Sequence, residues 1–266
     1  MGLIKAVIMD KDGSTIISPN ILPDELGELI QQNQHVHWIM ATGRSLCNVL
    51  KSPMVELLNP EAPQIIEGGA RVVNLNGDCL QVSHLQAHEI EHFLKVVDLD
   101  ALHYLFYSVD EGGGFMYSNN LEYWQEQIMV RRTTASLSEF VAWFDEIKPA
   151  KLSVRVKRNI DLPGVNWTQN DSYIDVTTAG VHKGSAVLDV LAMLGVSPSE
   201  TAFVFNDFND LPVLTHPELS QIVKIKVGDL LPDVAADYEL ESPYDVARVL
   251  KELLYPSLYK TRFKSH

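Results

Sequence analysis

The sequence has few cysteines, no long apolar run and no targeting segment. Its two cysteines among 266 residues, Cys47 and Cys79, are too few for a disulfide framework and too far apart for a CxxC metal or redox pair. We expect both to be small buried hydrophobic residues. No apolar segment is long enough to span a bilayer, and the first residues lack the pattern of a secretory signal. These absences predict a cytoplasmic protein with no membrane partner.

Positive charge is also scarce. Lys and Arg total 21 against 35 Asp and Glu, so the formal net charge is -14. Most of such a surface repels nucleic-acid backbones and anionic membranes, and we expect no nucleic-acid partner. A small phosphorylated substrate stays compatible with this charge, because a few local cations and a bound metal can dominate the potential inside a cleft. The oligomeric state is left open.

Strands and helices alternate in the first and last parts of the chain, which is typical of a parallel α/β sheet. The early elements are strands near 5–9, 36–41 and 64–67 and helices near 24–33 and 46–58. The late elements are a helix near 183–194 closed by Gly195, a strand near 202–205, a helix after Asn209 and a strand near 221–227. We therefore expect one doubly wound sheet built from residues 1–82 and 179–266.

The middle of the chain, residues 83–178, has a different pattern. It contains an aromatic run, a glycine-rich turn and two strands of alternating polarity, and it reads as a separate α+β unit inserted into the parallel-sheet domain. The expected elements are helices near 87–97, 121–130 and 137–147, a hairpin of 101–109 with 115–117, and strands near 151–157 and 173–176.

Two carboxylates, Asp10 and Asp12, follow the first apolar strand. Active sites of open α/β sheets lie just beyond the carboxyl ends of their strands, so the pair is expected at the mouth of a cleft. Carboxylates this close repel each other unless a cation or a shared proton relieves them, and their hard oxygens suit Mg²⁺. Lys11, between them, is compatible with such a site if its side chain points away from the cleft.

A second strand ends in Thr42-Gly43-Arg44. Backbone N–H groups at such a turn can hold an anion, with the Thr42 hydroxyl as a further donor. Lys183 is the third candidate, because a lysine in the first turn of a helix opposes the helix dipole unless a phosphoryl group or a carboxylate lies beside it. His182 next to it is weaker evidence for a catalytic role.

The third strand ends in Asn206-Asp207-Phe208-Asn209-Asp210. Oxygens of Asn206, Asp207 or Asp210 could join Asp10 around a metal ion. A single helix cap explains one such segment, but three strand ends with complementary chemistry point to one shared site.

In this order, the segments resemble the haloacid dehalogenase superfamily of phosphohydrolases. That family's pattern is Asp-x-Asp-Gly-Thr/Ser, a strand-end Ser/Thr, a Lys, and an acidic Gly-Asp-x-x-Asn-Asp segment. The further segments Ala41-Thr-Gly-Arg44, Glu67-Gly-Gly-Ala70 and Ile174-Asp-Val-Thr-Thr-Ala-Gly-Val-His-Lys-Gly184 are similar to the Cof-type sugar-phosphate phosphatases. Mannosyl-3-phosphoglycerate and sucrose-phosphate phosphatases are the nearer relatives in style. The resemblance implies a Rossmann-like parallel-sheet core with an inserted α+β cap of type C2.

The resemblance also implies a mechanism. Asp10 would attack phosphorus to form an aspartyl-phosphate, and Asp12 would act as acid and then base. Thr42 and Lys183 would hold the phosphoryl oxygens, and Asn209 and Asp210 would orient Lys183 or metal-bound water. Mg²⁺ would be held by Asp10, the Asp12 carbonyl, and Asn206 or Asp207.

One position departs from the family pattern. Alignment on Asn209-Asp210 places Phe205-Asn206 where the family has Gly-Asp, so the usual metal-binding aspartate becomes Asn206 unless the adjacent Asp207 replaces it. One carboxylate fewer is expected to weaken Mg²⁺ binding. This departure makes a catalytically weak phosphosugar-binding protein one alternative to a sugar-phosphate phosphatase. The other is a phosphomutase, which shares the nucleophile but returns the phosphoryl group to the substrate.

Cations of the inserted unit are candidates for substrate recognition. Strand alternation places Lys151, Ser153, Arg155 and Lys157 on one face, which we expect to turn toward the cleft with Arg155 as a substrate contact. Gly43 and Arg44 are expected beside the substrate, although Arg44 serves equally well as a helix-end ion pair. The other cations of the unit are Arg131, Arg132 and Arg158.

Overall fold

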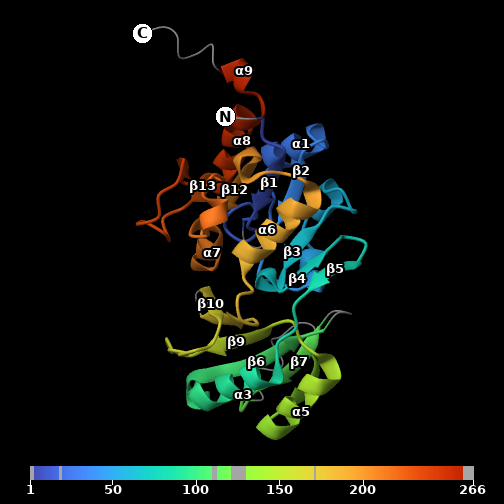
Figure 1. Cartoon of the computed structure of the whole chain (residues 1–266), viewed down its shortest axis with the longest axis vertical. Coiled ribbons are helices and arrows are strands. Elements are labelled where there is room, and N and C mark those ends of the chain that lie inside the picture. The colour runs from blue at the N-terminus through green and yellow to red at the C-terminus, as the bar shows by residue number, and fades with distance from the viewer. Residues whose placement is uncertain (1–2, 18–19, 110–112, 121–129, 171, 260–266) are drawn as a thin grey trace.

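A computed structural model places two sheets one above the other along the longest axis of the molecule (Figure 1). It describes residues 3–17, 20–109, 113–120, 130–170 and 172–259. The upper part contains a parallel sheet with helices on both faces, and the lower part contains an antiparallel-rich sheet with helices on its outer face. This arrangement confirms the predicted α/β class with an inserted α+β cap.

The parallel sheet has the strand order β14-β13-β12-β1-β2. Its strands are β1 (Ala6–Met9), β2 (His37–Met40), β12 (Thr201–Phe205), β13 (Val223–Val227) and β14 (Tyr238–Leu240). β1 lies in the sheet between β2 and β12, with Ala6 opposite both His37 and Thr201. Every residue of β1 and β12 is buried, which explains their unbroken apolar sequences.

Helices cover both faces of this sheet. They are α1 (Asp24–Gln32), α2 (Leu46–Val49), α6 (Lys183–Leu194), α7 (Leu211–Leu214) and α8 (Val246–Leu254). The short α9 (Pro256–Tyr259) follows α8 beyond the end of the sheet (Figure 1). Val7 and Met9 of β1 pack in one hydrophobic cluster with residues of α1 and α8, whereas Ala6 and Ile8 pack in another with residues of α6 and α7. The alternation of side chains along one strand thus supplies both cores.

The second sheet, which we call the cap sheet, has the order β10-β11-β9-β6-β7-β8. Its strands are β6 (Leu102–Ser108), β7 (Gly114–Tyr117), β8 (Val130–Thr134), β9 (Leu152–Val156), β10 (Trp167–Asn170) and β11 (Tyr173–Val176). The pairing of β6 with β7 confirms the predicted hairpin. The exact domain boundaries, 82/83 and 178/179, stay predictions.

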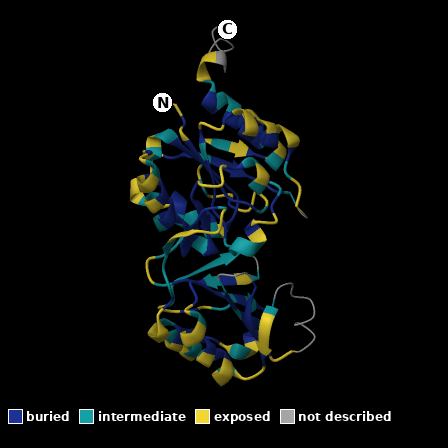
Figure 2. Ribbon diagram, turned by 90° about the vertical axis from the view of Figure 1, so that its right-hand side faces the viewer, coloured by how far each residue is buried: buried dark blue, intermediate teal, exposed yellow. Residues whose placement is uncertain are grey.

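One face of the cap sheet carries its own hydrophobic core. Helices α3 (Ala87–Val96) and α5 (Leu137–Ile147) pack there, with Phe93, Phe140 and Trp143 against the strands. Their outer surfaces are exposed, while most residues of the central strands β6, β7 and β9 are buried (Figure 2). The opposite face of the sheet, which carries Tyr104, Ser153 and Tyr173, turns toward the parallel sheet and lines a cavity there.

A small antiparallel sheet lies beside the parallel one. It consists of β3 (Gln64–Ile66), β4 (Arg71–Val73) and β5 (Cys79–Val82). The turn Glu67-Gly68-Gly69 joins β3 to β4 with three successive positive φ angles, 52°, 71° and 100°. A Cβ on Gly69 would lie 2.4 Å from the carbonyl oxygen of His182, so this turn can approach the start of α6 only because residue 69 is glycine.

Two predicted helices differ from the structure. The helix expected over 46–58 ends at Val49, and only a short 3-10 helix (Val55–Leu57) follows it. Pro53 explains the interruption, because proline disfavours helix for the residue before it and lacks the N–H that a continuing helix needs. Of the helix expected over 121–130, residues 121–129 lie outside the described residues, and Val130 begins β8.

The expectation of two buried cysteines is wrong. Cys79 is exposed because β5 is an edge strand of the small sheet, and Cys47 is half-buried, with its Sγ 3.2 Å from the Ser45 hydroxyl. Sequence patterns also missed the short strands β4, β5, β8 and β10. Each has five residues or fewer, and β5, β8 and β10 are edge strands, so their apolar patterns are short or weak.

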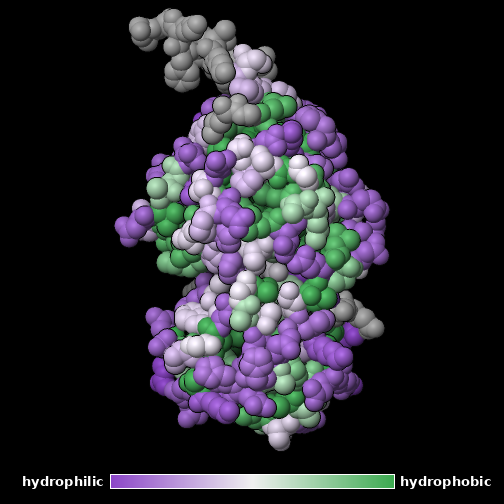
Figure 3. Space-filling view, viewed as in Figure 1, coloured by the Kyte–Doolittle hydropathy of each residue, from purple (hydrophilic) through white to green (hydrophobic). Residues whose placement is uncertain are grey.

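The surface seen in the view of Figure 1 is uneven in polarity. Hydrophilic side chains cover most of the cap, and apolar side chains gather over α6 and β5 (Figure 3). Met193 of α6 and Leu80 of β5 are about half exposed, at 49% and 45%. None of the helices in the described residues combines the length and apolar character needed to cross a membrane.

Tyr107 in the cap core yields the first prediction. Its ring stacks on Phe140 with centroids 4.3 Å apart, but its buried hydroxyl has no hydrogen-bond partner, and burial raises its pKa. Tyr107→Phe keeps the stack and removes the unsatisfied group, so we expect the free energy of unfolding to stay equal or rise by up to about 1 kcal/mol. Urea denaturation measures this change.

Tyr117→Phe is the matched control. The Tyr117 hydroxyl donates to Asn119 Oδ1 at 2.8 Å, so its loss should lower stability by about 1 kcal/mol. A Tyr107→Phe variant that loses as much stability as Tyr117→Phe would show that the Tyr107 hydroxyl is satisfied in solution.

Candidate functional site

Segments from four distant parts of the chain meet at the carboxyl edge of the parallel sheet. Asp10 follows β1 and Asn206 follows β12, its immediate neighbour, while Thr42 comes soon after β2 on the other side. Parallel strands end at the same edge, so their following residues are brought together by the strand order alone. Lys183, the first residue of α6, enters from the helix layer.

Lys183 is the centre of this arrangement. Its Nζ lies 2.6 Å from Asp10 Oδ1, 2.7 Å from Asp210 Oδ1 and 3.1 Å from Asn209 Oδ1, so all three act as acceptors. Lys183 and Asp210 are almost completely buried. Burial opposes the charge of the ammonium, but the carboxylates of Asp10 and Asp210 outweigh that cost and raise the pKa of Lys183. The lysine therefore stays positively charged.

Asp10 is buried as well and is held from two sides. Ser14 Oγ donates to Asp10 Oδ2 at 3.2 Å, opposite the contact with Lys183, and Thr15 Oγ1 donates to the backbone carbonyl of Asp10. Burial raises the pKa of Asp10 to about 7, because the loss of hydration outweighs the attraction of Lys183. The nearby carboxylates of Asp210 and Asp12 raise this pKa further. A further positive charge at this carboxylate would favour its ionised form.

Asp12 is in a more open, cationic environment. Arg44 contacts it with two nitrogens, Nε to Oδ2 at 2.5 Å and an Nη to Oδ1 at 3.0 Å. Lys11 also contacts Asp12, with its Nζ 3.2 Å from Asp12 Oδ1. Burial raises the pKa of Asp12, but Arg44 and Lys11 together reverse this effect and hold it below the ordinary value.

The Glu67-Gly68-Gly69 turn donates two backbone hydrogen bonds to the turn Thr42-Gly43-Arg44. Gly68 N donates to the Thr42 carbonyl, and Glu67 N donates to the Arg44 carbonyl. Thr42 is buried, and its hydroxyl oxygen accepts from Arg44 N at 3.2 Å. The sequence Glu67-Gly-Gly-Ala70 thus positions both the Thr42 turn and, through Gly69, the start of α6.

Oxygen donors for a cation lie beside Asp10 and Asp12. The Asn206 side chain contacts the Asp12 carbonyl oxygen, with Nδ2 at 3.2 Å, and its Oδ1 is buried without a hydrogen-bond partner. An orphaned buried oxygen next to a carboxylate and a carbonyl fits a hard cation such as Mg²⁺. Among the described residues, no three His, Cys, Asp or Glu side chains form a metal cluster, so such a site depends on amide and carbonyl oxygens.

Asp207 lies next to Asn206 but makes other contacts. Its Oδ1 accepts from Phe208 N, and its own N–H donates to Asp210 Oδ2. With these two hydrogen bonds, Asp207 caps the short 3-10 helix Phe208–Asp210 (η5). Asn206 contacts the Asp12 carbonyl. Which of the two residues serves a metal stays a prediction.

A cavity of about 530 Å³ lies between this edge and the cap sheet. Asp10, Asp12, Thr42, Gly43, Arg44 and Asn209 line it from the parallel-sheet side. Lys151 reaches across the gap, with its Nζ 2.5 Å from the Gly43 carbonyl oxygen and 2.8 Å from Asp175 Oδ1. Lys151 thus ties the cap to the turn that carries Thr42.

The cap face of the cavity is mostly uncharged, with Lys151 and Asp175 as its charged residues. Tyr104, Phe106, Ser153, Asn170 and Tyr173 line it. Lys151 and Ser153 therefore face the cavity, as the strand alternation predicted. Arg155 lies over the Tyr173 ring, 4.1 Å from its centroid, and its role as a substrate contact stays a prediction.

Three further cap cations have partners that do not line the cavity. Arg132 pairs with Glu146 at 2.8 Å, and Arg158 contacts Asp98. Lys157 donates to the Asp100 carbonyl at 3.0 Å. Sequence reasoning missed Ser14, Tyr104 and Asp175. Ser14 could have been inferred from its place in the Asp-x-Asp-Gly-Ser motif, whereas the cap residues join the site only through the docking of the two sheets.

Comparison with known proteins agrees with this geometry. The model of the haloacid dehalogenase-like hydrolase family matches residues 7–224. A search of curated proteins found no match.

Solved structures with the same architecture cover nearly the whole chain. BT1666 from Bacteroides thetaiotaomicron, described among phosphatases of the haloalkanoate superfamily, is 17% identical with a TM-score of 0.75, covering 94% of this chain and 95% of its own. The subclass IIB sugar phosphatase BT4131 is 16% identical with a TM-score of 0.71, covering 93% and 98%. TM0651 from Thermotoga maritima is 16% identical with a TM-score of 0.69, covering 94% and 97%. At these identities, the likeness concerns the fold.

Asp210 provides a test of the Lys183 centre. Asp210 accepts from Lys183 Nζ, Asn206 N and Asp207 N, and an asparagine has one acceptor oxygen in place of two. Asp210→Asn therefore removes one of the two negative charges that compensate the buried Lys183 ammonium, and it should lower the free energy of unfolding by about 3 kcal/mol. Urea denaturation measures the loss.

Asp189→Asn on α6 is the matched control. Asp189 accepts a surface hydrogen bond from Gln81, so its replacement should change stability by less than about 0.5 kcal/mol. Equal effects of the two substitutions would contradict a structural role for the Lys183–Asp210 pair.

Proposed function

The chain belongs to the haloacid dehalogenase-like hydrolases, and from this membership we propose that it is a Mg²⁺-dependent phosphatase acting on a small phosphorylated metabolite, a sugar phosphate, through an aspartyl-phosphate at Asp10. The observation that carries the proposal is the contact of a buried carboxylate, Asp10, with a buried ammonium, Lys183, at the floor of a cavity that Thr42 also lines.

Asp10 is proposed as the nucleophile. One carboxylate oxygen attacks phosphorus, the bond between phosphorus and the ester oxygen breaks, and the leaving oxygen takes a proton from Asp12. Water then attacks the phosphorus of the acyl phosphate, Asp12 accepts a proton from that water, and inorganic phosphate leaves with Asp10 regenerated. A carboxylate needs no activating base for the first step.

Arg44 explains how Asp12 changes its protonation. In the free protein, Arg44 and Lys11 keep Asp12 ionised. An incoming phosphoryl group competes with Asp12 for the guanidinium, and the release of that contact raises the proton affinity of Asp12. Thr42 and Lys183 are proposed to hold the phosphoryl oxygens during transfer, with Asn209 and Asp210 orienting Lys183.

Mg²⁺ is proposed to be held by the Asp10 carboxylate, the Asp12 carbonyl and Asn206 Oδ1. The orphaned Asn206 oxygen supports this assignment. When bound, the ion supplies positive charge that favours ionised Asp10 and neutralises the transferring phosphoryl group. The Asn206 amide brings no negative charge to the site, so we propose that the site binds Mg²⁺ more weakly than one with an aspartate at residue 206.

The cap is proposed to contact the leaving group, with residues 83–178 as the cap and residues 1–82 and 179–266 as the catalytic core. The hydroxyl, amide and aromatic groups of the cap face suit a neutral hydroxylated leaving group such as a sugar. The two cations near it, Lys151 and Arg155, are engaged with Asp175 and Tyr173.

Asp10→Asn tests the nucleophile. With Mg²⁺ and a panel of sugar phosphates or an aryl phosphate, the wild-type protein should release inorganic phosphate, and Asp10→Asn should lower kcat by roughly 10³-fold or more. After acid quenching with a radiolabelled phosphoryl donor, label should remain on the wild-type chain and be missing from Asp10→Asn.

Asp189→Asn, on the surface of α6, is the activity control and should keep wild-type turnover. Full turnover by Asp10→Asn, or label on its chain, would eliminate Asp10 as the nucleophile. Interconversion of sugar-phosphate isomers without phosphate release would instead indicate a phosphomutase.

Asn206→Asp tests both the metal site and the alternative of a weak phosphosugar-binding protein. The added carboxylate should tighten Mg²⁺ binding by about tenfold or more, measured by calorimetry without substrate. Asp207→Asn, which keeps an oxygen to cap η5, should leave Mg²⁺ affinity nearly unchanged. The opposite pattern would assign the metal to Asp207. Turnover that appears only in Asn206→Asp would identify the natural chain as a binding protein.

A further inference from the structure

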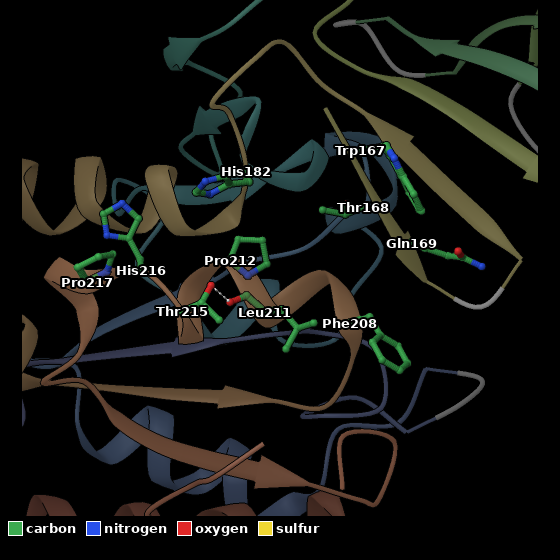
Figure 4. Close-up of a pocket in the computed structure, with 10 residues that line it drawn as sticks. All are labelled: Trp167, Thr168, Gln169, His182, Phe208, Leu211, Pro212, Thr215, His216 and Pro217. Carbon is green, nitrogen blue, oxygen red and sulfur yellow. Dashed lines mark hydrogen bonds between the residues drawn. The ribbon is translucent and has the colours of Figure 1, made fainter. Parts of the chain in front are cut away.

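A second cavity lies outside the catalytic site, also between the cap and the parallel-sheet part. Its volume is about 800 Å³. Trp167, Thr168 and Gln169 of β10 line it from the cap, and Leu211 and Pro212 of α7 line it from the other side (Figure 4). None of the proposed catalytic or metal-binding residues lines it.

Strand β10 separates the two cavities. Its last residue, Asn170, lines the catalytic cavity, whereas the three residues before it line the second one. β10 also contacts η5, whose first residue, Phe208, lines the second cavity and whose next residue, Asn209, accepts from Lys183. A molecule in the second cavity would therefore contact both β10 of the cap and η5, the segment that contacts Lys183.

Two imidazoles lie together at one end of this cavity, those of His182 and His216 (Figure 4). Their ring centroids are 6.3 Å apart. His182 Nδ1 accepts from Ser185 N at 3.0 Å, and His216 Nδ1 accepts from Glu218 N at 3.3 Å.

These two hydrogen bonds determine where the ring protons are. A nitrogen that accepts an N–H carries no proton, so in each ring the proton lies on Nε2. Burial, with a contribution from His216, lowers the pKa of His182 and keeps it neutral. Neither Nε2–H has a hydrogen-bond acceptor within the described part of the chain. The cavity therefore presents two hydrogen-bond donors of fixed orientation.

The rest of the lining is uncharged and mostly apolar, with Thr168, Gln169 and Thr215 as its polar residues. Trp167 and Phe208 lie away from the histidine end in the close-up, and the Phe208 side chain is 53% exposed although it follows a buried strand end. No Asp, Glu, Lys or Arg among the described residues lines the cavity. Such a site disfavours polyanions and cations, and it suits a flat apolar body with an oxygen acceptor at one end.

We propose that this cavity is a ligand site for a small aromatic molecule that carries a carbonyl or carboxylate oxygen. The oxygen accepts from the Nε2–H groups of His182 and His216, and the aromatic body packs against Trp167, Phe208 and Leu211. The ligand bridges β10 of the cap and α7, and it binds independently of substrate and Mg²⁺.

Three indoles with one common ring system test the proposal. Indole-3-carboxamide has a neutral oxygen acceptor, indole-3-carboxylate has a charged one, and 3-methylindole has none. Each is titrated into the full chain while the indole N–H resonance of Trp167, assigned by its loss in Trp167→Phe, is followed by NMR. An acceptor-bearing indole should shift this resonance to saturation, and 3-methylindole should bind about three- to tenfold more weakly. The tighter of the two acceptors tells whether the ligand is neutral or acidic.

His216 variants separate the donor from the packing. His216→Phe keeps a ring without a donor, and His216→Asn keeps an oxygen that can cap the 3-10 helix Pro217–Leu219 but removes the Nε2–H. Both should weaken the acceptor-bearing indoles about three- to tenfold and leave 3-methylindole within about twofold. The urea midpoint of His216→Asn should match that of the wild type, whereas that of His216→Phe should be slightly lower because the cap is lost.

The proposal is overturned if none of the indoles shifts the Trp167 resonance, or if 3-methylindole binds as tightly as the carboxamide and the carboxylate. Unchanged binding of all three indoles by correctly folded His216 variants would also overturn it, because the imidazole donors would then have no part in recognition.

Discussion

The ion pairs of Lys183 with Asp10 and Asp210 are the interaction on which the rest of the site depends. They join the end of β1, the start of α6 and the segment after β12. An ammonium loses its hydration when it is buried, and only two carboxylates with good geometry offset that loss. Because Asp210 also accepts from the backbone of Asn206 and Asp207, the same contact shapes the loop that is proposed to hold a metal ion.

Much of the fold could be predicted from the sequence, because the parallel sheet is encoded in local patterns. β1 and β12 are unbroken apolar segments, and α6 begins and ends where Lys183 and Gly195 indicated. The errors lie where local patterns are weak. Pro53 interrupts a helix although the apolar periodicity of the sequence continues past it. The four residues of β10 are all half-buried, so polar and apolar residues show no clear alternation along this short strand.

The candidate site at the edge of the parallel sheet could be predicted in the same way, because strand order brings Asp10, Thr42 and Asn206 to one place. The cap side could not. Lys151 is recognisable as a polar residue of a strand, but its contacts with Asp175 and the Gly43 carbonyl arise only when two sheets dock. The two histidines of the second cavity are likewise 34 residues apart, and their shared tautomer depends on backbone N–H groups that no motif marks.

The strand order also has a consequence for how the chain is made. The ribosome releases β1 and β2 early, but the partner on the other side of β1 is β12, since Ala6 pairs with Thr201. All six strands of the cap sheet emerge between them. The cap sheet has its own hydrophobic cluster and can collapse during synthesis, whereas the open edge of β1 must wait unpaired until β12 arrives. That open edge is where a nascent chain of this kind is most exposed to pairing with a strand of another chain.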